Sequence, residues 1–180
     1  MNGPEVFKYS LPKVYEMILT ILNSNQISQK ILRLSWQVYE DNFSEKEITL
    51  VGIGEQGLLI AEQVKIHLNN ISKLKTTILR IDVDRIKPFN KVSSELLKND
   101  YSDKVIILID DVLHSGKTLT YAFKNFLNTS IKKMAVLVLI DRNHNSFPVK
   151  ANYVGLSLST TLKEYIEVVL KGNNKGVYLS

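Results

Sequence analysis

Four short apolar runs dominate the pattern of hydrophobic and polar positions along the chain. They cover residues 48–53, 76–83, 105–109 and 134–140, and each has the length of a buried strand. A helical pattern through AEQVKIHL follows the first run, and the third is followed by Leu119, Ala122, Phe123, Phe126 and Leu127 at helical spacing. Strands that are apolar on both faces and alternate with helices are typical of a parallel sheet covered on both sides. The pattern therefore predicts an α/β fold with a central parallel sheet.

The two ends of the chain have different patterns. One short amphipathic helix fits Leu11, Val14, Tyr15, Ile18, Leu19 and Leu22, and after the NSNQ sequence a second fits Ile27, Ile31, Leu34 and Val38, with Trp36 as a packing residue. Near the C-terminus, YVGLSL, YIEVVL and GVYL are strand-like without helices between them, which predicts a small appended antiparallel piece. The polar stretch from Asp84 to Asp103 predicts a long loop or flexible flap. We expect a single domain over residues 1–180.

Composition excludes several classes of protein. The chain has 180 residues, of which 44% are hydrophobic and 23% charged, and it contains no cysteine. Disulfide scaffolds, thiol nucleophiles and cysteine-based metal sites are therefore excluded. No apolar run approaches the roughly 18 residues of a membrane span, and the N-terminus lacks the pattern of a secretory signal. These features favour a cytoplasmic protein with no membrane contact.

The net charge of +5 raises the question of nucleic-acid binding. Only four of the 23 basic residues are arginines, and no cluster of five or more basic residues occurs. Sequence-local patches that would follow a phosphate backbone are therefore absent, although folding could gather dispersed lysines. RNA binding remains a secondary alternative.

The segment from Val105 to Phe123 carries the strongest chemical pattern. The third apolar run ends in two adjacent carboxylates, Asp110 and Asp111, and a short turn, Ser115-Gly116-Lys117-Thr118, opens the next helix. Backbone N–H groups, two hydroxyls and a lysine at a helix N-terminus favour one phosphate group. The acids would repel that phosphate, so they require hydroxyls, a divalent metal or a developing cation. The segment predicts a sugar-phosphate site, against the simpler alternative of a helix cap and an ordinary turn.

A nucleoside-triphosphate loop is the other interpretation of the same residues. Gly116-Lys117-Thr118 ends such a motif, but the motif requires glycine at position 111, where the chain has aspartate. This difference argues against a triphosphate cradle.

Residues 106–118, IILIDDVLHSGKT, resemble the phosphoribosyl pyrophosphate (PRPP) motif of the type I phosphoribosyltransferases. The resemblance implies that Asp110 and Asp111 hold the ribose hydroxyls, directly or through Mg²⁺. It also implies that His114, Ser115, Gly116, Lys117 and Thr118 take the 5′-phosphate. Further segments, from LVGIGEQGLLIAEQV to DRNHNSFPVKANYVGLSLSTT, resemble the branch that combines pyrimidine-operon regulation with uracil phosphoribosyltransferase activity. The likeness spans about residues 27–179.

The turn Gly52-Ile53-Gly54-Glu55-Gln56-Gly57 fits the glycine pattern of a dinucleotide site. The acids Asp82 and Asp84 lie later than the spacing of about 20 residues that such a site expects, so the dinucleotide interpretation is the weaker one. The resemblance instead implies a pyrophosphate loop over Gly54, Glu55, Gln56 and Gly57.

This loop departs from the pattern of the branch, which has a basic residue, a hydroxyl and an arginine there. Glu55 would repel pyrophosphate unless it points to solvent. Because no arginine remains there to neutralise the leaving group, turnover would fall on the order of 10²- to 10³-fold. Arg85, at the position of the family's flap arginine, would compensate in part.

The resemblance implies further roles near the C-terminus. Arg142 would reach pyrophosphate or the base, with a surface ion pair as the alternative role. Lys150, Tyr153 and Val154 would form the base pocket, with Tyr153 stacking on the ring. His114 stands where the purine-using branch has an aspartate, which favours a pyrimidine.

Together these features predict a phosphoribosyltransferase that binds PRPP with Mg²⁺ and acts on a base such as uracil. The alternative is a catalytically weak regulator that senses a nucleoside monophosphate and binds RNA. A homodimer or higher homo-oligomer is the expected assembly.

Overall fold

A five-stranded parallel sheet runs through the molecule. The computed structural model describes residues 19–83, 100–159, 161 and 164–180. The strands of this sheet are β2 (Glu47–Ile53), β3 (Lys75–Ile81), β4 (Val105–Leu113), β5 (Lys133–Asp141) and β6 (Tyr153–Ser157). They pair in the order β3-β2-β4-β5-β6, each parallel to its neighbours. The predicted α/β fold is confirmed.

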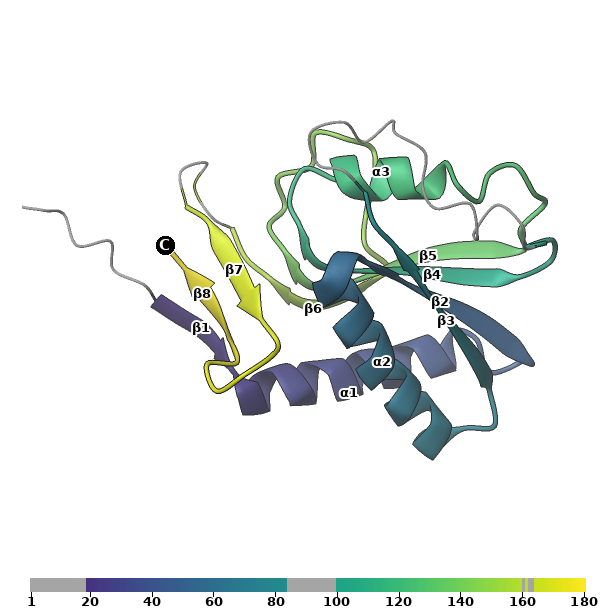
Figure 1. The fold of residues 1–180 in the computed structure, drawn as a ribbon, viewed down its shortest axis with the longest axis horizontal. Helices are drawn as coiled ribbons and strands as arrows, with labels where there is room; N and C mark the ends of the chain where they lie inside the picture. The colour runs from purple at the N-terminus through teal and green to yellow at the C-terminus, as the bar shows by residue number, and fades with distance from the viewer. Residues whose placement is uncertain (1–18, 84–99, 160, 162–163) are drawn as a thin grey trace, which may run out of the picture.

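Helices cover both faces of this sheet, as Figure 1 shows: α1 (Ser24–Glu40) and α2 (Gly54–Ile71) lie on one side and α3 (Lys117–Phe123) on the other. Successive side chains of β4 point to opposite faces. Ile107 and Ile109 pack in the core under α1 and α2, whereas Ile106 and Leu108 pack in the core under α3. This alternation explains why the strand is apolar at every position from 105 to 109.

A second, antiparallel sheet lies beside the first (Figure 1). It pairs β1 (Leu19–Asn23), β8 (Gly176–Leu179) and β7 (Ile166–Val169) in the order β1-β8-β7. The predicted helix over residues 11–22 is therefore wrong for residues 19–22, which form a strand, and its remainder lies outside the described residues. The small antiparallel piece is confirmed, although the N-terminal strand β1 supplies one of its edges.

The segment YVGLSL was assigned to the wrong sheet. It forms β6, which pairs parallel with β5 from Leu137↔Tyr153 to Asp141↔Ser157. The connection from β5 contains no helix, and the amide of Asn152 and its side chain bind the two backbone groups of Val136 at 2.9 Å. Without a helix in the connection, the sequence pattern could not distinguish a parallel edge strand from an antiparallel one.

Two side-chain predictions were also wrong. Helix α3 ends at Phe123, because the amides of Asn125 and Phe126 bond three residues back and tighten the chain into turns. Leu127 is consequently exposed, although Phe126 is buried. Trp36 is 44% exposed on the outer side of α1, where its ring meets Tyr39 edge-on.

The NSNQ sequence begins helix α1. The Asn23 side chain accepts from the Gln26 amide, and the Gln26 side chain accepts from the Asn23 amide, both at 2.9 Å. This reciprocal capping box satisfies two backbone N–H groups that a helix start leaves unpaired. In the described parts of the chain, no helix is both long and apolar enough to cross a membrane. Most of the predicted flap, residues 84–99, lies outside the described residues.

Candidate active site

Two carboxylates lie near the carboxyl end of β4. Pairing with β2 ends at Gly52↔Ile109, whereas pairing with β5 continues to Leu113↔Asp141. Asp110 and Asp111 are therefore part of the strand, just beyond the residues that pair with β2, and not in a loop after it. One oxygen of Asp110 accepts from the Asp111 amide at 3.0 Å, and one of Asp111 accepts from the Val112 amide at 2.9 Å. These bonds fix two half-buried carboxylates side by side.

The turn after β4 is held in a conformation that only glycine adopts readily. Gly116 precedes α3 with φ 80° and ψ −1°, in the left-handed region. The Ser115 carbonyl accepts from the amides of Ser146 and Phe147 at 3.0 Å, and the Lys117 amide donates to the Ser115 hydroxyl at 3.3 Å. The segment after β5 thus packs on the turn and fixes its shape.

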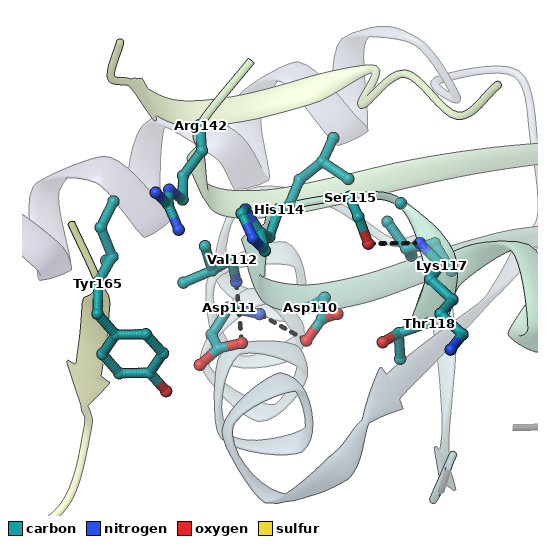
Figure 2. A pocket seen from close by; sticks show the side chains of 13 residues that line it. Asp110, Asp111, Val112, His114, Ser115, Lys117, Thr118, Arg142 and Tyr165 are labelled. Atoms are coloured by element: carbon teal, nitrogen blue, oxygen red, sulfur yellow. Dashed lines mark hydrogen bonds between the residues drawn. The ribbon is translucent and has the colours of Figure 1, made fainter. Parts of the chain in front are cut away.

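A pocket of about 260 Å³ joins the acids and the turn. Its lining comes from β4, the turn, the start of α3, the end of β5 and the start of β7: Asp110, Asp111, Val112, Leu113, His114, Ser115, Gly116, Lys117, Thr118, Leu119, Arg142, Tyr165 and Ile166. Figure 2 shows the two acids in the centre, the turn on one side and Tyr165 on the other. The structure thus brings together eight of the predicted site residues.

Tyr165 and Ile166 were not predicted as site residues. They lie at the start of β7 and line the pocket, and Tyr165 is 58% exposed although it is a large aromatic residue. The only signal in the sequence was the start of YIEVVL, which also fits an ordinary strand. Their place opposite the acids depends on how the small sheet docks on the large one.

Arg142 lies at the end of β5 and is only 3% exposed. Its Nη2 donates to the carbonyls of Thr161 and Glu164, at 3.1 and 2.8 Å. The guanidinium therefore lines the pocket and at the same time holds the backbone that leads into β7. Through these bonds Arg142 positions Tyr165, a role that the sequence did not indicate.

His114 is the titratable group of the turn. Partial burial, and then the nearby Arg142 and His144, lower the pKa of its imidazole below the ordinary 6.5. A neutral imidazole carries one nitrogen that donates and one that accepts a proton. Near neutral pH, His114 therefore presents a proton acceptor at the pocket.

The glycine-containing turn after β2 is the first turn of α2. Gly54 has φ 63°, and a Cβ on Gly57 would lie 2.4 Å from the Ile109 carbonyl, so only glycine allows this approach. The first turn of α2 therefore lies against β4, beside the two acids. Glu55 is 57% exposed and pairs with Lys171, and the Gln56 side-chain oxygen is buried without a hydrogen-bond partner in the described residues.

The three predicted base-binding residues do not line the pocket. Tyr153 is 3% exposed in the core at the start of β6, where its hydroxyl lies 3.5 Å from Asn42 Nδ2, and burial raises its pKa to about 12. The Val154 carbonyl accepts from Arg33 at 2.8 Å, and Lys150 is exposed. Val154 is level with Asp110 along the sheet, because both pair with Val138 of β5, but it lies two strands away, and Tyr153 packs in the core under α1 and α2. Arg85 lies outside the described residues.

The acids of β4 fit a magnesium ion. Carboxylate oxygens are the donors that Mg²⁺ prefers, and this ion usually binds through one or two carboxylates plus water and substrate phosphate. In the described ranges no group of three or more His, Cys, Asp or Glu side chains comes together. The Asp110–Asp111 pair has the number of carboxylates that such a site uses.

Comparison with known protein families accounts for this arrangement. Residues 17–169 match the family model of the phosphoribosyl transferase domain. The chain belongs to this family. Among its phosphoribosyltransferase relatives, it is 31% identical to the bifunctional protein PyrR of Caldicellulosiruptor bescii over 163 residues, which cover 86% of this chain and 90% of the relative. It is 33% identical to PyrR of Clostridium acetobutylicum over 160 residues, covering 84% and 90%.

Solved phosphoribosyltransferase structures share the fold. The hypoxanthine phosphoribosyltransferase of Trypanosoma cruzi superposes with a TM-score of 0.69 at 12% identity, covering 82% of this chain and 83% of the other. A hypoxanthine-guanine phosphoribosyltransferase of Bacillus anthracis superposes with a TM-score of 0.67 at 23% identity, covering 83% and 87%. The resemblance in the sequence is thus confirmed at the level of family and fold.

Proposed function

We propose that this chain transfers the phosphoribosyl group of PRPP to a pyrimidine base such as uracil. The observation that carries the proposal is the single pocket in which Asp110 and Asp111 stand beside the turn of residues 115–118. Such a pocket suits a ligand with sugar hydroxyls at one end and a phosphate at the other. The PyrR relatives support the choice of a pyrimidine.

The turn would hold the 5′-phosphate. Its backbone N–H groups, the hydroxyls of Ser115 and Thr118 and the Lys117 ammonium are donors of the kind that bind phosphate oxygens. Asp110 and Asp111 would accept from the ribose 2′- and 3′-hydroxyls. Bound at the same acids, Mg²⁺ would neutralise charge on the pyrophosphate group.

The residues of the pocket suit the transfer chemistry. The bond between ribose C1′ and the pyrophosphate oxygen breaks, a bond from C1′ to a ring nitrogen forms, and the ring loses a proton. The sugar carries positive charge in the transition state, which the fixed carboxylates of Asp110 and Asp111 would stabilise. The neutral imidazole of His114 would accept the ring proton.

Tyr165 would form one wall for the base. Its ring lies on the side of the pocket opposite the turn (Figure 2) and is 58% exposed. Aromatic rings bind planar heterocycles by stacking, at about 1–3 kcal/mol per base. A base placed there would have its ring nitrogen directed towards the sugar that the acids hold.

Ligand-dependent thermal unfolding tests the proposal. PRPP with Mg²⁺ should raise the melting temperature, because a ligand that binds only the folded state stabilises it. Asp110→Asn with Asp111→Asn should abolish the shift while keeping the side-chain volumes. An unchanged melting temperature of the wild-type protein at saturating PRPP would contradict the proposal. Pyrophosphate release across a panel of free bases would then identify the acceptor.

A second function, RNA binding controlled by UMP, is favoured by one observation. The first turn of α2 carries Glu55 where pyrophosphate would lie, which would reduce turnover without preventing nucleotide binding. The net charge of +5 is compatible with RNA. Titration of a labelled pyrimidine-leader RNA, with and without UMP, should show binding only with UMP. Absence of a shift at micromolar protein in modest salt would exclude this function.

A further inference from the structure

An acidic side chain occupies the first turn of α2, next to the proposed substrate pocket. The register Gly52↔Ile109 and the contact of Gly57 with the Ile109 carbonyl place this turn beside Asp110 and Asp111. Glu55 is the acid, and its pKa is lowered below 4.5, first by a hydrogen bond from Lys171. It is therefore ionised at neutral pH. An unpaired carboxylate there would repel a pyrophosphate group.

A cation from the other sheet reaches this carboxylate. Lys171 Nζ lies 2.5 Å from Glu55 Oε1, although the two residues are 116 positions apart in the sequence. Lys171 belongs to the turn between β7 and β8, just after the strand whose first residues line the pocket. The segment around β7 therefore supplies one wall of the pocket and also the cation, Lys171, that pairs with the first turn of α2.

The ion pair contributes little to folding by itself. The side chains of Lys171 and Glu55 are 62% and 57% exposed, and ion pairs between exposed groups stabilise folded proteins only weakly. The main effect of the ion pair is on the net charge at the first turn of α2. With Lys171 in place, the acid and the lysine together carry no net charge. Without Lys171, the turn presents a full negative charge.

We propose that Lys171 is a positioning residue for the pyrophosphate group: it holds and neutralises Glu55 so that the first turn of α2 accepts this polyanion. The inference rests on the proposed function, because it concerns the same pocket. It assigns a role in substrate binding to the turn between β7 and β8. Lys171 would thus act on the bound ligand through Glu55 and not by direct contact.

Binding calorimetry with three ligands tests the role, using PRPP, inorganic pyrophosphate and UMP, each with Mg²⁺. Lys171→Gln should weaken PRPP and pyrophosphate about three- to tenfold, as expected for one screened charge. UMP carries the 5′-phosphate without pyrophosphate, so its affinity should change less than about twofold. Lys175→Gln removes the same charge from the same turn and is the matched control, because Lys175 forms no ion pair with a described residue.

The double variant separates neutralisation from direct contact. If Lys171 acts through Glu55, then Glu55→Gln combined with Lys171→Gln should restore PRPP affinity close to that of the wild type. A double variant as weak as Lys171→Gln would mean that the lysine binds the ligand itself and would overturn the positioning role. Equal weakening of PRPP and UMP, or no weakening at all, would also overturn it. Failure of the wild-type protein to bind PRPP would instead reject the proposed function, and this inference with it.

Discussion

At the scale of single residues, the titration of His114 should differ from that of a free side chain. Its pKa is lowered first by partial burial and then by Arg142 and His144. An NMR titration of the free protein should therefore give a midpoint below 6.5. His144→Asn removes one neighbouring charge and should raise that midpoint, without reaching 6.5 because burial remains. A midpoint above 6.5 in the wild type would contradict the assignment.

The same shift has a consequence for stability. A lowered pKa means that folded His114 binds its proton less readily than the unfolded chain does. Its contribution to stability is therefore present above pH 6.5 and is lost as the pH falls towards the folded pKa. Denaturant unfolding of wild type and His114→Asn should converge between pH 7 and pH 5. A constant difference across that range would rule out this linkage.

Two tyrosines should respond to mutation in opposite ways. Tyr165 lines the pocket and is exposed, whereas Tyr153 is buried in the core. Tyr165→Ala should weaken UMP binding by about 1–3 kcal/mol with little loss of stability. Tyr153→Ala should reduce the free energy of unfolding by about 3–5 kcal/mol.

Tyr153→Phe is the control for this pair, because it keeps the core packed and removes only the hydroxyl near Asn42. It should bind UMP like the wild type, as judged by calorimetry. Weaker UMP binding in Tyr153→Phe would mean that the Tyr153 hydroxyl takes part in binding, contrary to its buried place near Asn42.

At the scale of elements, Gly57 sets the distance between α2 and β4. A Cβ at this position would lie 2.4 Å from the Ile109 carbonyl, so the helix would have to move away from the strand. Gly57→Ala should cost about 1–3 kcal/mol of stability, as overpacking does, and should weaken pyrophosphate binding because the first turn shifts.

Ala61→Gly is the matched variant for Gly57→Ala. Ala61 lies one turn later in α2 and is fully buried, so its loss should cost about 1 kcal/mol through helix propensity. In Ala61→Gly the first turn of α2 should stay in place, and the affinity for pyrophosphate should be retained. If both variants lost affinity in proportion to stability, the close contact of Gly57 would have no specific role in binding.

At the scale of the whole molecule, the pocket lies between two sheets. Asp110 and Asp111 come from the large sheet, whereas Tyr165 and Ile166 come from the small one. A ligand that contacts both should hold them together. Hydrogen exchange should therefore slow in β7 and β8 as well as in residues 110–118 when UMP binds. Protection confined to residues 110–118 would mean that the small sheet takes no part in binding.

The number of subunits is a second property of the whole molecule. The homodimer or higher homo-oligomer expected from the sequence stays a prediction, which sedimentation of the full chain would test. Several large apolar side chains are exposed in the described residues, among them Trp36 and Phe43.

Short-range patterns were sufficient for most of the fold and for half of the site. The four predicted strands became β2 to β5. In β2, β4 and β5, burial on both faces favours apolar residues, whereas the edge strand β3 keeps exposed polar residues. The acids and the turn of residues 115–118 were predictable as one site because they are contiguous in the sequence. When the residues of a site are neighbours in the sequence, a short motif is enough to recognise them.

The other half of the site depended on contacts between distant segments. Which sheet β6 joined, the exposure of Tyr165 at the pocket and the pairing of Lys171 with Glu55 follow from the docking of the C-terminal strands. Tyr153 begins a short strand and Tyr165 directly precedes one, and no local pattern distinguishes the one that is buried from the one that faces the pocket. The sequence by itself determined the strands and the segment with the two acids and the turn, because these depend on local periodicity and spacing. Only the tertiary structure decided which remote side chains meet that motif, because their positions depend on how two sheets pack.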